Sequence, residues 1–192
     1  MESVGTLRER KKAATRQSLH QAALRLAMAG GLDNVTVEDI ADEVGVSRRT
    51  FSNYFANKED AVLHADRERT RTLLDLVRGR PADEEAWQAL RRAVAQMYGA
   101  LTRPDPAWVA QLRLLRRHPS LLARQAADQI ELERELAEVL ASRGACDAEL
   151  ARLMAATFLA ALRTAGALWF EAGGEQQVSA LTDRLLDRVR FQ

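Results

Sequence analysis

Apolar residues recur at intervals of three and four along most of this 192-residue chain, which is the spacing of one face of an α-helix. No stretch alternates apolar and polar residues for long enough to indicate a β-strand. Hydrophobic residues make up 47% of the chain, with only four prolines and ten glycines, as in compact helical proteins. The sequence therefore predicts an all-α fold.

Two short helices and a tight turn are predicted between Thr36 and Lys58. Apolar residues at helical spacing mark the inner faces of these helices: Val37, Ile40, Ala41, Val44, Phe51 and Phe55. Thr36 and Ser47 stand at N-cap positions, each just ahead of a periodic segment. Gly45 supplies the backbone freedom that a short connection needs. This pattern is typical of a helix-turn-helix.

The second helix carries polar residues on the side away from its phenylalanines. At about 100° per residue, Asn53 lies nearly opposite Phe51 and Phe55. Arg49 and Thr50 flank it. Arginine can contact guanine O6 and N7 together, and asparagine can contact adenine in the same way. We therefore expect Arg49, Thr50 and Asn53 to face the bases of the DNA major groove.

Further DNA contacts are expected around this face, at Thr36, Val37, Ser47, Arg48, Tyr54 and Lys58. Ser47, Tyr54 and Lys58, together with the helix N-terminus, are placed for phosphates, which position a protein without specifying sequence. Arg48 lies nearer the rim, within reach of the backbone or a base edge.

The run from Gly31 to Leu63 resembles the N-terminal domain of TetR/AcrR-type bacterial transcriptional regulators. The matching positions are Gly31, Thr36, Val37, Ile40, Ala41, Gly45, Val46, Ser47, Thr50, Tyr54, Phe55, Lys58 and Glu59. Ser52 departs from the tyrosine that is frequent in the family. The resemblance implies a three-helix DNA-binding domain with a helix-turn-helix, residues 1–60, joined to a C-terminal helical bundle for effector binding and dimerisation, residues 61–192.

A local cluster of basic residues near the N-terminus has two possible interpretations. The net charge of +1 says little about partners. A basic cluster precedes the helix-turn-helix and contains Arg8, Arg10, Lys11, Lys12 and Arg16. It resembles the phosphate-contacting arm of the family, while the alternative is a solvated helix start.

Amphipathic helices are predicted for the rest of the chain, beginning after Asn57, Asp83, Asp105, Pro119, Asp147 and Gly174. The first of these should run unbroken to about Arg80. Large aromatic, methionine and amide side chains in these helices form either plain core or the lining of an effector pocket: Trp87, Met97, Tyr98, Trp108, Gln125, Gln129 and Phe158. The family resemblance favours a small, largely apolar effector that releases the protein from DNA.

Residues 148–172 are apolar almost all round, so both faces of this helix must be buried. We expect one face to meet a second copy of the chain. The predicted dimer contacts are Leu159, Arg163, Gly166, Phe170, Leu181 and Leu185. A two-fold dimer would read half-sites about 34–36 Å apart, or a multiple of this, and the operator would be an inverted repeat. The resemblance implies a repressor.

Other functions receive less support from the residues. His20, His64 and His118 are scattered along the chain and match no catalytic or metal-binding motif, so we expect no enzyme, cofactor or metal. A sequence-nonspecific or architectural DNA binder remains the alternative. The single cysteine, Cys146, fits a reducing cytosol. The chain shows neither a secretory signal nor an apolar run that we expect to span a membrane, so a cytoplasmic protein is predicted.

Overall fold

The computed structural model describes residues 7–99, 106–144, 146–173 and 177–191. Within these ranges the regular structure is helical and contains no strand, which confirms the predicted fold class. Contacts divide the chain into two compact units, residues 1–67 with 105–126 and residues 68–104 with 127–192. The division falls inside two helices, α5 (His64–Arg78) and α8 (Pro119–Ser142). A functional domain boundary near residue 60 stays a prediction.

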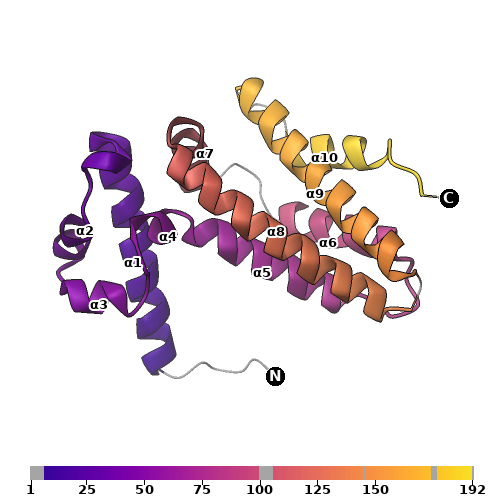
Figure 1. Cartoon of the computed structure of the whole chain (residues 1–192), viewed down its shortest axis with the longest axis horizontal. Helices are drawn as coiled ribbons and strands as arrows, with labels where there is room; N and C mark the ends of the chain where they lie inside the picture. Colours follow the sequence, from indigo (N-terminus) through magenta and orange to yellow (C-terminus); the bar gives the residue numbers. More distant parts are fainter. Residues whose placement is uncertain (1–6, 100–105, 145, 174–176, 192) are drawn as a thin grey trace. The chain divides into compact units, whose positions relative to one another are not determined.

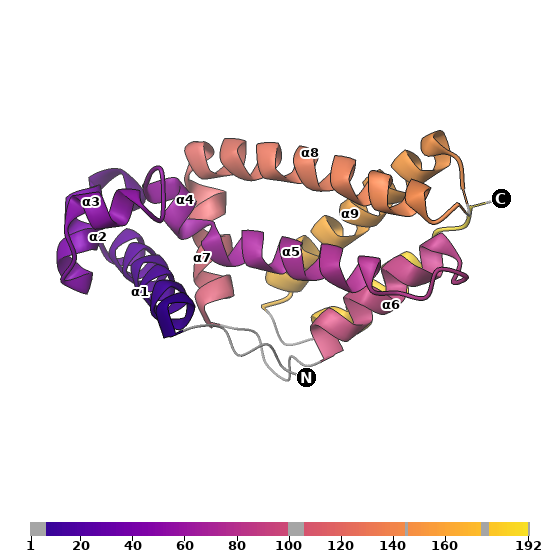
Figure 2. The same ribbon diagram turned by 90° about the horizontal axis from the view of Figure 1, so that it is seen from below.

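The first unit contains the predicted helix-turn-helix. Its elements are α1 (Leu7–Gly30), the 3-10 helix η1 (Leu32–Asn34), α2 (Val37–Val44), α3 (Arg48–Ser52), α4 (Lys58–Val62), α7 (Pro106–Arg117) and the adjoining ends of α5 and α8. Helix α1 packs against α2 and α4 (Figure 1), and also against α7 (Figure 2). Leu19, Ile40 and Phe51 are fully buried at the centre of this core. The small α2–α3 corner is therefore anchored on a long helix.

The helix predicted to run unbroken from Asn57 to about Arg80 is interrupted at one residue, Leu63. Helix α4 ends at Val62, and α5 begins at His64. Leu63 between them has φ −84° and ψ 1° and is fully buried. The local pattern predicted continuity because Leu63 keeps the helical spacing. Burial of this side chain in the first core takes precedence over local propensity.

The second unit is built from α6 (Ala86–Gly99), α9 (Ala148–Glu171), α10 (Val178–Leu186) and the remaining parts of α5 and α8. Helices α9 and α10 lie side by side (Figure 1), and α10 also packs against α6. The ring of Trp87 meets those of Phe158 and Phe191 edge-on, at centroid distances of 6.1 and 4.9 Å. These rings form part of a second apolar core.

The starts of α9 and α6 are each capped by an acidic side chain. Asp147 caps α9, because its carboxylate accepts from the N–H of Leu150. Asp83, expected to cap α6, does not do so. Glu85 takes this role, and its two carboxylate oxygens accept from the N–H groups of Trp87 and Gln88, each at 2.9 Å. A longer acidic side chain can reach back to the same orphan amides.

Candidate functional site

The two caps of the helix-turn-helix form as predicted. Thr36 and Asp39 make a reciprocal capping box at α2, in which each side chain accepts from the backbone N–H of the other. Ser47 caps α3 by accepting from the N–H of Thr50 at 3.1 Å. Gly45 ends α2 in the left-handed region, at φ 73°. Because both helix starts and the turn are locally fixed, the orientation of α3 follows from the sequence.

The outward face of α3 is anchored from below by two phenylalanines. Phe51 is fully buried, and Phe55 is 7% exposed with its ring centroid 5.7 Å from that of Phe51. Arg49 and Asn53 are exposed on the other side. Their side chains make no hydrogen bond or ion pair with any described residue. The predicted polar face therefore exists, and two of its three residues are available to a partner.

Thr50, the third residue of that face, is half-buried. Its hydroxyl lies 2.9 Å from that of Ser47. The two hydroxyls share one hydrogen bond, so one of the two protons remains available for a phosphate or a base.

Arg48 leans toward α2 rather than outward over α3. Its Nη1 lies 2.8 Å from Oε1 of Glu38, with both side chains well exposed. An exposed ion pair of this kind contributes about 0–1 kcal/mol. The guanidinium can therefore exchange Glu38 for a DNA phosphate at little cost.

Lys58 is used in a way that the sequence did not predict. Its ammonium donates to the carbonyls of Leu32 and Val35 at 2.8 and 2.9 Å, with that of Asp33 at 3.5 Å. These carbonyls belong to η1 and the residue after it, so the lysine closes this short turn against α4. A phosphate contact by Lys58 stays a prediction and would require the ammonium to leave these carbonyls.

The predicted DNA contact at Thr36 meets a similar constraint. Its N–H and its hydroxyl both donate to Oδ2 of Asp39, at 2.8 and 2.6 Å. Both of its donors are therefore occupied. The amide of Val37, at the first position of α2, has no partner within its own helix and is the better-placed donor for a phosphate.

The fold joins Tyr54 to the basic cluster of α1, which the sequence left as separate features. A cleft of about 520 Å³ is lined by Tyr54 and by Arg8, Lys11 and Lys12 of the first turns of α1. The guanidinium of Arg16 lies over the Tyr54 ring, 5.8 Å from its centroid. Three cations beside an aromatic side chain can serve a phosphate backbone, and this contact stays a prediction.

Comparison with known proteins agrees with this geometry. Residues 19–65 match the profile of the bacterial regulatory proteins of the tetR family, and residues 84–191 match that of the MftR C-terminal domain. The HTH-type transcriptional regulator TcmR of Streptomyces glaucescens is 34% identical over 173 residues, covering 85% of this chain and 76% of TcmR. The chain belongs to the TetR family. It is a DNA-binding transcriptional regulator.

Solved structures show the same fold at lower identity. The fatty acid degradation regulator FadR from Bacillus halodurans is 20% identical, with a TM-score of 0.60 over 93% of this chain and 97% of its own. FadR of Thermus thermophilus, solved in complex with lauroyl-CoA, is 22% identical, with a TM-score of 0.60 over 92% and 97% of the two chains. The two-part helical architecture is thus that of TetR-family regulators.

The residues predicted to line an effector pocket are divided between the two units. Trp108 and Gln125 belong to the first unit, where the Gln125 amide donates to Asp66 at 3.0 Å. Trp87, Met97, Tyr98, Gln129 and Phe158 belong to the second unit. Phe158 and Trp87 are core residues in contact, although the indole N–H of Trp87 has no acceptor among the described residues. Their effector contacts stay predictions.

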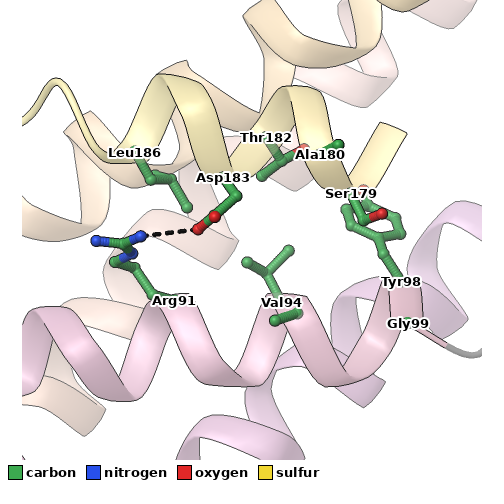
Figure 3. Close-up of a pocket in the computed structure, with 10 residues that line it drawn as sticks. Arg91, Val94, Tyr98, Gly99, Ser179, Ala180, Thr182, Asp183 and Leu186 are labelled. Carbon is green, nitrogen blue, oxygen red and sulfur yellow. Dashed lines mark hydrogen bonds and ion pairs between the residues drawn. The ribbon is translucent and has the colours of Figure 1, made fainter. Parts of the chain in front are cut away.

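Tyr98 of this TetR-family regulator lines a different cavity from the one expected. The cavity lies between α6 and α10 and is also lined by Val94, Asp183 and Leu186 (Figure 3). Local sequence patterns could not predict this cavity, because α6 and α10 are far apart in the chain and their contact depends on the tertiary fold.

The predicted dimer residues are only partly accessible. Arg163 is exposed, Leu181 is 8% exposed, and Leu159, Gly166, Phe170 and Leu185 are half-buried. Sequence reasoning missed two leucines on α9, Leu153 and Leu168, which are 56% and 42% exposed. Their separation of fifteen residues places them on one side of the helix, so helical periodicity could have revealed them.

Helix α9 also differs from the expectation that no segment could span a membrane. By length and composition it is long and apolar enough to do so, and 28% of its most apolar stretch is buried within the chain. Length and composition alone do not distinguish a membrane span from the core helix of a soluble protein. Membership of the TetR family favours the core helix of a soluble protein.

Two histidines that are scattered in sequence meet in the first core. The rings of His20 and His64 lie edge to face, with centroids 5.7 Å apart, and both side chains are buried. Nδ1 of His20 lies 2.8 Å from the carbonyl oxygen of Ala61, as for a donated hydrogen bond. These contacts connect α1 with α4 and α5 and show the pair in a packing role.

Proposed function

We propose that this regulator binds an inverted-repeat operator as a homodimer, represses transcription, and leaves the DNA when a small, largely apolar effector binds. The observation that carries the proposal is the α3 face, where Arg49 and Asn53 are exposed and unpaired above the buried Phe51 and Phe55. Base-reading side chains need such freedom, since a residue already paired within the protein would have to give up that partner first.

Phosphate contacts are proposed on both sides of α3. The cleft formed by Tyr54 and the start of α1 lies at one side, and Ser47 with the N-terminus of α3 supplies further donors. Together they would fix the position of α3 in the major groove. Because these contacts displace counterions, binding should weaken steeply as salt increases.

Dimerisation is proposed through the exposed side of α9. A single five-residue helix offers few base contacts, whereas two copies related by a two-fold axis read two half-sites. Leu153 and Leu168 leave apolar area exposed on α9, and a second copy would cover it. With that face buried between copies, the protein would be soluble and cytoplasmic.

Regulation by a ligand is proposed by analogy with relatives of the same fold. The Thermus FadR structure contains lauroyl-CoA, a ligand with a long apolar chain. An effector acts by binding better to the DNA-incompetent state than to the DNA-bound one.

An electrophoretic mobility shift tests the proposal. The DNA upstream of the gene for this protein is compared with unrelated DNA of equal length, at low and at physiological salt. We expect retention of the upstream DNA alone at physiological salt, with a dimer-sized complex. Equal retention of both DNAs would instead support a sequence-nonspecific binder, and no retention at low salt would refute DNA binding by this face.

A further inference from the structure

A cavity of about 360 Å³ is lined by residues of α6 and α10 (Figure 3). Val94 reaches into its middle from α6, with Tyr98 and Ser179 at one end and the Arg91–Asp183 pair at the other. The volume lies within the range of small-molecule sites, roughly 300–1,000 Å³. The walls are largely apolar, and the polar groups are concentrated at the ends.

The charged end of this cavity is formed by Arg91 and Asp183, and Asp187 pairs with the same arginine. Nη2 of Arg91 lies 2.7 Å from Oδ1 of Asp183 and 2.5 Å from Oδ1 of Asp187. Hydrogen bonding to Asp183 raises the pKa of Arg91 above its ordinary value, so the guanidinium remains charged. One guanidinium thus pairs with two carboxylates.

The two carboxylates differ in their position relative to the cavity. Asp187 also pairs with Arg91, and it does not line the cavity. Asp183 does line it, and its carboxylate is 64% exposed. Arg91 and Asp183 are the charged groups among the described lining residues. Asp183 can therefore accept a second cation while α6 and α10 remain joined through Asp187.

We propose that this cavity binds a small molecule with an apolar body and one ammonium group. The ammonium pairs with Asp183, and the body packs against Val94, Leu186 and the Tyr98 ring. A carboxylate ligand at the same place is disfavoured, because it would become a third anion around one guanidinium. An aromatic ring in the wall adds attraction for a nearby cation.

This inference rests on the proposed function for its regulatory consequence and refines the chemical class of the effector. Helix α10 packs against α9, on which the dimer face is proposed. A ligand between α6 and α10 would act on α10 and, through it, on α9. Effector binding would then bias the spacing of the two α3 helices by way of the dimer helices.

Isothermal titration calorimetry on the full chain without DNA tests the ligand class. The probes are 4-phenylbutylamine, 4-phenylbutanol and 4-phenylbutanoate, which share one body and differ in the charge of the head group. We expect the amine to bind about tenfold more tightly than the alcohol, as for a hydrogen bond to a charged group, and the carboxylate to bind most weakly. Equal affinities, a preference for the carboxylate, or no heat with the amine at millimolar concentration would overturn the proposal.

Two variants test the place of binding. Asp183→Asn should lower amine affinity to that of the alcohol while alcohol binding stays the same. The matched control is Glu138→Gln, which removes an exposed acid that pairs with Arg134 away from the cavity. Ala95→Trp adds bulk at an exposed lining position and should abolish binding of all three probes.

Thermal melting checks that each variant is folded. Unchanged amine binding in either Asp183→Asn or Ala95→Trp would place the site elsewhere. Since DNA is absent, failure of this test leaves the mobility shift unaffected, and failure of the mobility shift leaves the ligand measurement valid.

Discussion

The carboxylate of Asp60 on α4 lies 3.0 Å from the guanidinium of Arg124 on α8. The same oxygen is 3.0 Å from Nη2 of Arg67 on α5, and the Asp60 side chain is only 7% exposed. Carboxylates at such depth require charged partners. The three residues therefore join α4, directly behind the helix-turn-helix, to the first turns of α5 and α8.

Removing both arginines should destabilise the protein by more than the two single changes together. In Arg124→Ala or Arg67→Ala the remaining arginine still pairs Asp60, and we expect a loss of about 1 kcal/mol each, as for a single hydrogen bond whose acceptor keeps another partner. The double variant leaves a buried carboxylate unpaired and should lose about 3–5 kcal/mol. Urea unfolding measures the free energy of unfolding of the two single variants and of the double variant.

Arg25→Ala is the control for this cycle, because its pair with Glu43 is exposed and worth about 0–1 kcal/mol. Simple additivity of the Arg67 and Arg124 changes would show that Asp60 is satisfied by water.

Arg49→Ala should weaken operator binding by about 1–3 kcal/mol and relax the preference at one base pair. Its guanidinium is exposed and has no partner in the described residues, so it is available for guanine. Arg48→Ala, on the same helix but paired with Glu38, should weaken specific and unrelated DNA alike. Fluorescence anisotropy with a panel of single-base operator variants distinguishes the two. The reverse assignment would hold if Arg48→Ala altered base preference and Arg49→Ala did not.

The capping box at α2 should make stability depend on acid pH. Hydrogen bonds from Thr36 hold the pKa of Asp39 below its ordinary value of 3.8. Since the folded-state pKa is lowered, the stabilisation is complete above the unfolded-state value and is lost as the pH falls through the folded one. The stability difference between the wild type and Asp39→Asn should therefore shrink below about pH 4, as linkage requires.

Asp42→Asn serves as the control, because Asp42 is exposed on the same helix and is not part of the cap. Urea unfolding at pH 7 and at successively lower pH gives the comparison. If the stability difference between the wild type and Asp39→Asn stayed constant down to pH 2, the charge of Asp39 would not contribute to the stability of the capping box.

Leu153→Glu should convert the proposed dimer to monomer, because it places a charge on the apolar face of α9. The double change with Leu168→Glu should do so more completely. Leu122→Glu is the matched control, since Leu122 is 50% exposed on α8. Sedimentation velocity at micromolar concentration reports the mass. Monomerisation by Leu122→Glu alone would move the interface to α8.

Local interactions account for most of what the sequence predicted correctly. The caps at Thr36 and Ser47 connect residues three apart, and Gly45 satisfies a turn by its own backbone conformation. Phe51 and Phe55 are one helical turn apart, so their burial also fixes which side of α3 is exposed. Interactions of this range can be derived without knowing the rest of the chain.

Contacts between distant segments were not predictable in this way. Lys58 binds carbonyls more than twenty residues earlier, and Tyr54 closes a cleft with the start of α1. Asp60 gains an arginine from α8. Each of these contacts depends on how the helices pack against one another. A periodic pattern of apolar residues does not determine that packing.

The sequence alone determined that the chain is helical, where the helix-turn-helix lies and which face of α3 is polar, because caps, turns and helical periodicity are set by near neighbours. Only the tertiary structure decided where the buried Asp60 finds its counter-charges, how the predicted pocket residues divide between two units, and that α6 and α10 line a cavity with the Arg91–Asp183 pair at one end. These features require segments remote in the chain to meet. Packing of whole helices, rather than any local pattern, brings them together.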